Sequence, residues 1–417
     1  MTRPPNLDPV MMRGMTQPRI GRRDMLRLMG AAGAASVLTA CGVSGQGDST
    51  TQTRNQVKDY WSKQHEHGVL NFANWPLYLD VAAGNKSDHP TLDAFTKQTG
   101  IKVKYFEVIQ DNGPFFAKVR PSLEGGQYCG YDIAVITNGI FFTQFEALGY
   151  LVPLDQKRMT NFYKYAGDKF QNRSFDKGNI YSMPWQAGFT GIGYDPARTG
   201  RKITSWQDLA DPKFSGKIGM FGNNEDLPNC ALLALGIDPT TSSPDDWQKA
   251  ADWLNKQKPL VRKYYSQDYA AALANGDIWI TMAWSGDIFQ LNLSGSKLEF
   301  VLPEEGALLF IDNMLLLKGV QNPVDAMELM DFYYDPRQAA TLAEWVNYIS
   351  PVPDAQQVVS SDAAKASGGD KTYLESLVNS YAVFPTPQEY AKASLGRPLK
   401  LSELNQWNSI FQPVYQS

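Results

Sequence analysis

Residues 278–318 have the sequence IWITMAWSGDIFQLNLSGSKLEFVLPEEGALLFIDNMLLLK, and two apolar runs within it organise the rest of the chain. Ile278–Ala283 and Leu308–Leu317 are rich in large and branched apolar residues. Short apolar runs of this kind are typical of strands that are buried on both faces of a sheet. We therefore expect two interior strands here.

Each of these runs brings an aromatic ring close to an acid, because Trp284 precedes Asp287 and Phe310 precedes Asp312. Buried strands rarely carry an acid unless a cation meets it. An acid beside an aromatic face suits an organic ammonium, since the ring adds ~0.5–2 kcal/mol of cation–π attraction. Taken singly, Asp287 could equally cap a helix and Asp312 could end a strand. Two such pairs favour a ligand site.

Upstream of this stretch, strand patterns alternate with helix patterns, which predicts an α/β fold with a parallel sheet. The expected strands are Val69–Trp75, Ile101–Val108 and Tyr131–Ile136, and the expected helices are Thr91–Gly100, Phe115–Leu123 and Ile140–Leu148. Tyr181–Tyr194 is Gly-rich and extended, so we expect it to cross into another lobe. Further helices are predicted downstream at 204–209, 227–235, 245–257, 269–275, 323–333, 338–348, 371–380 and 401–411, with a strand at 217–221.

The length of 417 residues predicts two or three domains, or one large two-lobed unit. The net charge is −4, and residues 1–40 carry +4, so residues 41–417 carry −8. An acidic body argues against nucleic acid and favours a cationic small molecule. Aromatic residues make up 12% of the chain, which suits either a flat or cationic ligand or a large core.

The histidine and cysteine positions argue against several kinds of catalytic site. All three histidines lie within residues 65–89, so a Ser-His-Asp, Cys-His or His-ligated metal site in the main body is not expected. We expect no enzyme activity, no metal and no cofactor. Cys129 and Cys230 could form a disulfide outside the cytoplasm or stay as buried thiols; their spacing favours thiols.

Residues 1–40 have the pattern of an export signal. Arg22 and Arg23 resemble a twin-arginine signal, and the 13-residue apolar run 28–40 is too short to span a bilayer. The sequence LTAC at 38–41 resembles a bacterial lipobox, which would make Cys41 the lipidated N-terminus. The alternative is an ordinary secretory signal with an incidental cysteine. Residues 41–68 are predicted to be a flexible tether, although Tyr60 and Trp61 could begin to pack onto the body.

The order of short motifs along the chain resembles that of bacterial periplasmic polyamine-binding proteins, the spermidine- and putrescine-binding components of ABC importers. The resemblance covers about Val69 to the C-terminus, and no single motif in it is specific. The motifs are Asn74-Trp75 with Tyr78, a Thr-Gly pair at 99–100, Tyr131-Asp132-Ile133, GYLVPLD at 149–155, Thr204-Ser205-Trp206 with Leu209, Trp284-Ser285-Gly286-Asp287, PEEG at 303–306 and Phe310-Ile311-Asp312-Asn313.

The resemblance implies a two-lobed periplasmic solute-binding fold of type II, in which each lobe is a mostly parallel sheet flanked by helices. Crossing strands near Gly188 and Asn313, with a third crossing near Gln357, would form the hinge. The first lobe would comprise residues 69–187 plus 313–357, and the second lobe residues 188–312 plus 358–417. The protein would be a monomer that passes its ligand to a membrane permease.

In this family, aromatic side chains flank the methylene chain of the amine and carboxylates hold its ends. The matching positions here are Trp75, Tyr78, Asp226, Trp284, Asp287, Phe310, Asp312 and Tyr348. Three positions depart from the common pattern: Phe310 replaces a Trp, Asn223 replaces an acid of the spermidine type, and Gly139 replaces a Tyr. These departures weaken the inference to spermidine and leave a shorter diamine or another cation open.

Other interpretations of these residues stay open from the sequence. Trp75, Trp284 and Tyr348 could be core aromatics, and Asp226 could cap a helix that starts at Leu227. The same fold could bind an amino acid derivative, a sugar or a phosphonate. A surface glycoside hydrolase could use two of the three acids Asp226, Asp287 and Asp312.

Overall fold

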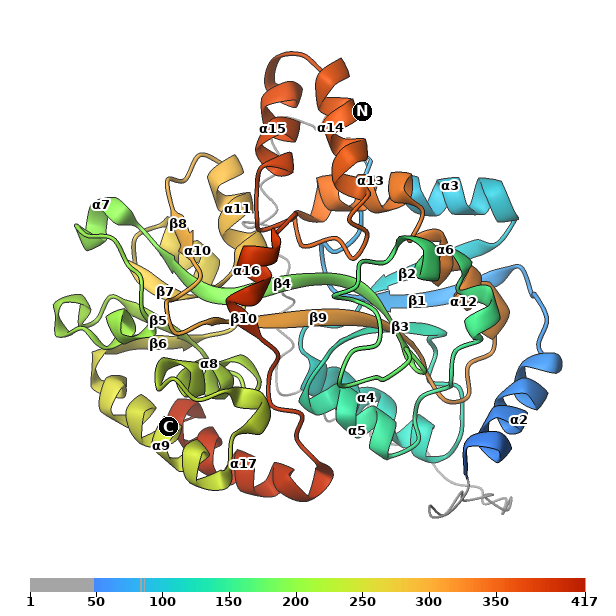
Figure 1. Cartoon of the computed structure of the whole chain (residues 1–417), viewed down its shortest axis with the longest axis horizontal. Helices are drawn as coiled ribbons and strands as arrows, with labels where there is room; N and C mark the ends of the chain where they lie inside the picture. Colours follow the sequence, from blue (N-terminus) through green and yellow to red (C-terminus); the bar gives the residue numbers. More distant parts are fainter. Residues whose placement is uncertain (1–48, 83–84, 86, 417) are drawn as a thin grey trace, which may run out of the picture.

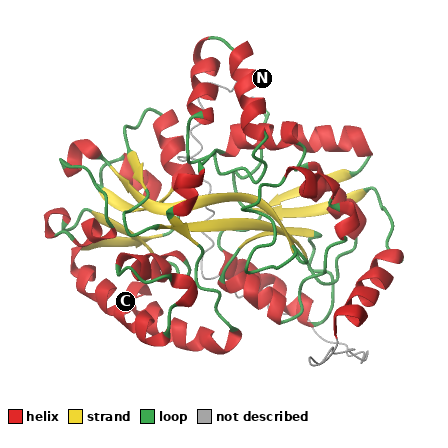
Figure 2. Cartoon of the chain, viewed as in Figure 1, coloured by secondary structure: helices red, strands yellow, loops and turns green. Residues whose placement is uncertain are grey.

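A mixed β-sheet runs across the whole molecule (Figure 1) (Figure 2). The computed structural model describes residues 49–82, 85 and 87–416. The strands are β1 (Val69–Asn74), β2 (Lys102–Glu107), β3 (Ile133–Thr137), β4 (Ser182–Tyr194), β5 (Ile218–Phe221), β6 (Val261–Tyr265), β7 (Ile280–Trp284), β8 (Glu299–Val301), β9 (Ala307–Leu316) and β10 (Ala393–Ser394). Their order is β2-β1-β3-β9-β4-β7-β5-β6, with β10 on β9 and β8 on β4.

Parallel pairing at both ends of the sheet defines two lobes. Strand β1 pairs in parallel with β2 and β3 in the first lobe, and β5 pairs in parallel with β6 and β7 in the second. Strands β4 and β9 run antiparallel to each other and join the two lobes. Each lobe therefore has the expected parallel strands, and β4 and β9, which contain Gly188 and Asn313, are the expected crossing strands.

The crossing strands approach each other closely at Gly188, which lies opposite Phe310 in the register. A Cβ atom on Gly188 would lie 2.4 Å from Cζ of Phe310, so only glycine leaves room for this ring. Gly188 therefore allows the Phe310 ring to pack directly on the backbone of β4, between the two lobes.

Helices cover both faces of the sheet (Figure 2). Their bounds are α2 (Ser49–Ser62), α3 (Pro90–Thr99), α4 (Asn112–Glu124), α5 (Ile140–Ala147), α6 (Thr160–Tyr165), α7 (Pro196–Thr199), α8 (Asp226–Ala234), α9 (Pro244–Gln257), α10 (Tyr269–Ala274), α11 (Ser285–Leu293), α12 (Pro323–Phe332), α13 (Pro336–Val346), α14 (Ala355–Lys365), α15 (Gly368–Val378), α16 (Pro387–Ala391) and α17 (Leu401–Gln416). The amphipathic helix α9 starts at Ser243 with a capping box and buries Trp247 and Leu254, as its sequence pattern predicts.

Helices α14 and α15 form a projecting hairpin that follows α13 (Figure 1). Val359 of α14 and Leu377 of α15 pack in the same core as Leu70 of the first lobe. After α15, the next residue that packs in the second-lobe core is Leu399. The boundary at 357/358 and the third crossing near Gln357 stay predictions.

The predicted tether at 41–68 is helical over much of its length, since α2 spans Ser49–Ser62. Trp61 is buried in the first-lobe core, and its indole N–H donates a 2.9 Å hydrogen bond to the carbonyl of Pro153. The predicted signal at 1–40 and Cys41 lie outside the described residues. No helix of the described ranges is both long and apolar enough to cross a bilayer.

Cys129 and Cys230 are free thiols. Cys129 packs against the first-lobe cluster that contains Phe115, whereas Cys230 is buried in the second-lobe core. The two cysteines thus stabilise their lobes as small apolar residues and do not link them.

Candidate ligand-binding site

A cavity of about 170 Å³ lies between the lobes where the parallel strands of both lobes end. Residues that end or follow these strands line it: Trp75 after β1, Asp111 after β2, Thr137 at the end of β3, Asn223 to Asp226 after β5, Ser266 after β6 and Trp284 at the end of β7. Leu308 to Phe310 and Asp312 of β9 also line the cavity. Carboxyl ends of parallel strands are the common ligand-binding edge of α/β sheets. The topology therefore brings distant segments to one site.

Asp312 is a buried carboxylate held by two hydroxyl groups. Thr137 Oγ1 donates to its Oδ1 at 2.7 Å, and the Tyr78 hydroxyl donates to its Oδ2 at 2.7 Å. Burial raises the pKa of Asp312 to about 6, although both hydroxyl donors act to lower it. Asp312 therefore combines a buried position with a carboxyl group that is mostly ionised at neutral pH.

Asp226 provides a second carboxylate, from the opposite lobe. Thr190 Oγ1 donates to its Oδ1 at 2.7 Å and Asn223 Nδ2 donates to its Oδ2 at 3.0 Å. Burial raises the pKa of Asp226, while the donors from Thr190 and Asn223 act to lower it. The start of α8 is capped by Asn223 instead, whose Oδ1 accepts the Asp226 backbone N–H at 2.7 Å. The capping role considered for the Asp226 side chain is thus filled by its neighbour.

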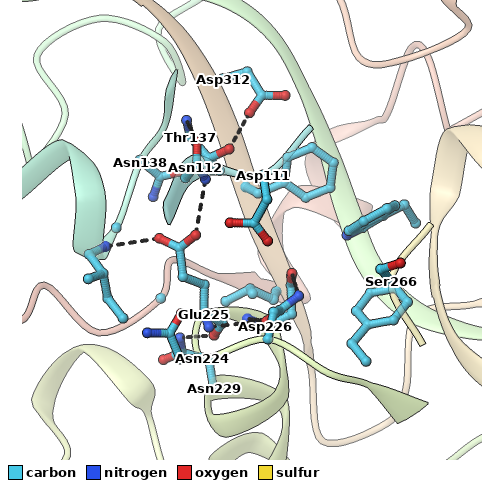
Figure 3. A pocket seen from close by; sticks show the side chains of 18 of the residues that line it. Asp111, Asn112, Thr137, Asn138, Asn224, Glu225, Asp226, Asn229, Ser266 and Asp312 are labelled. Carbon is cyan, nitrogen blue, oxygen red and sulfur yellow. Dashed lines mark hydrogen bonds between the residues drawn. The ribbon is translucent and has the colours of Figure 1, made fainter. Parts of the chain in front are cut away.

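Two further acids, Asp111 and Glu225, line the cavity, and neither was predicted from the sequence as a site residue. Asp111 caps α4 through a 2.8 Å hydrogen bond from the Gly113 backbone N–H, and its carboxylate faces the other acids in Figure 3. Burial raises the pKa of Glu225 to about 8, and the nearby charge of Asp226 adds to this. The signal that could have found Asp111 is its place directly after the second predicted strand.

Aromatic rings form a continuous wall along the cavity. Ring centroids lie 4.7 Å apart for Phe221 and Trp284, 6.5 Å for Trp284 and Phe310, 6.2 Å for Phe310 and Tyr348, and 5.6 Å for Tyr348 and Tyr78. Such a wall offers apolar contact to a methylene chain and ring faces to its ammonium ends.

Trp75 lies on the first-lobe side of the cavity, where its indole N–H donates to the carbonyl of Val135 at 3.0 Å. This bond fixes the ring against β3. Together with the rings of the wall, it means that every aromatic residue predicted from the sequence lines the same cavity: Trp75, Tyr78, Trp284, Phe310 and Tyr348.

Asp287 is the one predicted site residue that does not line the cavity. The Tyr348 hydroxyl donates to its Oδ1 at 2.7 Å and the Tyr269 hydroxyl donates to its Oδ2 at 2.9 Å. The Tyr269 hydroxyl also accepts the backbone N–H of Trp284 at 3.0 Å. The first turn of α11 therefore places the Asp287 side chain against Tyr348 and Tyr269, and its direct contact with a ligand stays a prediction.

The charge of the cavity acids is not cancelled by basic side chains. Arg397 is the one Lys or Arg among the described lining residues, and it is paired with Glu403 at 3.0 Å. Within the described part of the chain, no Lys or Arg nitrogen lies within 4.0 Å of the carboxylates of Asp226 or Asp312. The cavity is therefore an acidic slot walled by rings, an arrangement whose charge is complementary to a cation.

Comparison with known families identifies the class of protein. Residues 91–368 match the model of a family described as bacterial extracellular solute-binding protein. This chain belongs to that family. Its members are extracytoplasmic proteins that bind substrates for transport, and the two-lobed fold with a cavity between the lobes agrees with that class.

Individual relatives narrow the comparison. The spermidine/putrescine-binding periplasmic protein of Escherichia coli strain K12 is 28% identical over 308 residues, which cover 74% of this chain and 83% of that protein. A putrescine/cadaverine-binding protein of Pseudomonas aeruginosa is 30% identical over 298 residues, covering 68% and 79%. A solved structure described as a putative spermidine/putrescine ABC transporter from Listeria monocytogenes superposes with a TM-score of 0.69 at 25% identity, covering 83% and 98%.

Proposed function

We propose that this protein captures a polyamine, putrescine or spermidine, outside the cytoplasm and delivers it to the permease of an ABC transporter. The observation that carries the proposal is Asp312, a buried carboxylate beside a wall of rings with no basic side chain against it. A desolvated ammonium needs such an anion, and the methylene chain gains apolar contact with the rings. The names of the relatives support the same ligand class.

The two ends of the ligand would meet acids from the two lobes. Asp312 lies on a crossing strand beside Tyr78 and Thr137 of the first lobe, and Asp226 begins α8 of the second lobe. An amine bound between them would be held by both lobes at once, so binding would favour the closed arrangement. Release to the permease would then require the lobes to separate.

Lipid anchoring through Cys41 is part of the proposal. Two acyl chains on one residue give stable attachment, and residues 42–48 would separate the anchor from α2. Replacing Cys41 by Ser should move the protein from the membrane fraction to the soluble fraction of cells. Retention of the Cys41→Ser variant in the membrane fraction would rule out this anchor. We further propose that the protein acts as a monomer.

The test of the ligand class is a calorimetric panel at pH 7.5. Putrescine, cadaverine and spermidine should bind with micromolar or tighter affinity, whereas γ-aminobutyrate, glucose and a phosphonate should not. Tight binding of a neutral or anionic compound with no response to the amines would exclude the polyamine proposal. Release of reducing sugar from cell-wall glycans in a parallel assay would instead favour a glycoside hydrolase.

A further inference from the structure

Glu225 connects the two lobes directly, although the sequence gives it no role. It precedes α8 in the second lobe, and its carboxylate accepts two hydrogen bonds from the first lobe (Figure 3). Asn112 Nδ2, at the start of α4, donates to Oε2 at 3.0 Å, and the Ile140 backbone N–H, at the start of α5, donates to Oε1 at 3.1 Å. Both partners are donors, so both oxygens of the Glu225 carboxyl group act as acceptors.

The surrounding geometry is built around this carboxylate. A Cβ atom on Gly139 would lie 3.0 Å from Glu225 Oε1, so the glycine leaves the space that the carboxylate occupies. The Ile140 side chain is only 3% exposed and packs in the second-lobe core, whereas Phe142 and Phe145 of the same helix pack in the first lobe. A polar and an apolar contact thus cross between the lobes at one point.

A chain of hydrogen bonds leads from this point to the cavity. The Asn112 side chain that donates to Glu225 also accepts the Thr137 backbone N–H at 3.4 Å. The Thr137 hydroxyl in turn donates to Asp312 at 2.7 Å. None of these contacts involves a ligand, so they can form in the empty protein.

We propose that Glu225 is a latch that holds the two lobes together before any ligand binds. The Glu225 carboxyl group accepts hydrogen bonds from the first turns of α4 and α5 and so links them to α8. Ile140 adds an apolar contact between the lobes at the same place. The closed arrangement therefore has stabilising contacts of its own, and a ligand adds to them. This inference concerns the empty protein and does not depend on which solute is bound.

The test is hydrogen exchange at the Ile140 amide in ligand-free protein, followed by NMR or by mass spectrometry of a short peptide. Glu225→Gln keeps the side-chain shape but turns one donor–acceptor contact into a donor–donor contact. Exchange of the Ile140 amide should become roughly tenfold faster, the change expected from losing one hydrogen bond. Ile140→Ala, which weakens the apolar contact with the second-lobe core, should also speed exchange of the amide at position 140.

The matched control is Glu304→Gln, which makes the same substitution in an exposed turn of the second lobe and should leave exchange of the Ile140 amide unchanged. Amides of β3 report whether the first lobe itself has loosened, and they should keep their protection in every variant. If Glu225→Gln speeds exchange in β3 as well, Ile140→Ala alone decides the outcome. The latch proposal would be overturned if the Ile140 amide is unprotected in the parent protein. It would also be overturned if this amide exchanges at the same rate in the parent and in the deciding variant. Because no amine is added, this result is independent of the polyamine panel.

Discussion

The Tyr78 hydroxyl donates a 2.7 Å hydrogen bond to Oδ2 of Asp312, joining the segment after β1 to the middle of a crossing strand. A phenol is a neutral donor at neutral pH, so it stabilises the carboxylate without cancelling its charge. The Thr137 hydroxyl, also a neutral donor, donates a hydrogen bond to Oδ1 of Asp312. Asp312 is thus kept ionised in a buried position while its charge stays available to a cationic guest.

Replacing Tyr78 by Phe tests the value of this donor. The variant keeps the ring of the aromatic wall but removes the hydrogen bond, so the pKa of Asp312 should rise further. Putrescine affinity at pH 7 should fall by about 1–2 kcal/mol, or roughly 5- to 30-fold, by isothermal titration calorimetry. Tyr163→Phe, an exposed tyrosine of the first lobe, is the matched control and should bind as the parent does. Equal putrescine affinity of Tyr78→Phe and the parent would show that the Tyr78 hydroxyl does not contribute to ligand binding.

The raised pKa of Asp312 predicts a stability cost in the empty protein. A carboxyl with a pKa of about 6 in the fold and about 3.9 in the unfolded chain holds its proton more tightly when folded. Its contribution to stability therefore falls as pH rises from about 4 to about 6, by up to about 3 kcal/mol. Removing the carboxylate should relieve this cost wherever Asp312 is ionised.

Ligand-free Asp312→Asn should accordingly melt a few degrees higher than the parent at pH 8, with a smaller difference at pH 4.5. The gain is less than the full cost, because Asn accepts from only one of Tyr78 and Thr137. Differential scanning calorimetry at the two pH values measures this directly. A lower melting temperature for Asp312→Asn at pH 8 would show that the carboxylate stabilises the empty fold.

Asp287 and Tyr348 should behave as one unit. Asp287→Ala and Tyr348→Phe each break the 2.7 Å hydrogen bond between them, so the double variant should bind putrescine about as weakly as either single variant. The loss for each should be about 1–2 kcal/mol, because the ring loses its support but no ammonium is left unpaired. A much larger loss for Asp287→Ala alone, of about 3 kcal/mol or more, would mean that Asp287 contacts the ligand itself.

Much of the fold follows from patterns that are local in sequence. Gly100 ends α3 in the left-handed conformation with φ of 82°, as a glycine after a helix predicts. The apolar runs Ile278–Ala283 and Leu308–Leu317 form β7 and β9, which are buried because neighbouring strands and helices cover them. Strand β6 was missed because its sequence VRKYY carries charges, which an edge strand can direct to solvent.

The details of the site depend on directions that local patterns do not give. Asp287 and Asp312 both follow an aromatic residue, yet one lies in the first turn of a helix and the other in a strand, so they face different neighbours. Glu225 and Asp226 are adjacent but bond to different lobes. Asp111 reaches the cavity only because parallel strands bring their carboxyl ends together.

The most direct test of the central claim is the affinity of Asp312→Asn for putrescine and spermidine, measured by isothermal titration calorimetry at pH 7.5. Asp277→Asn, an exposed aspartate of the second lobe, serves as the control and should bind like the parent. An acidic slot walled by rings predicts a loss of roughly 100-fold or more for Asp312→Asn, since a buried ammonium would be left without its anion. Parent-like affinity of a folded Asp312→Asn protein would contradict the account.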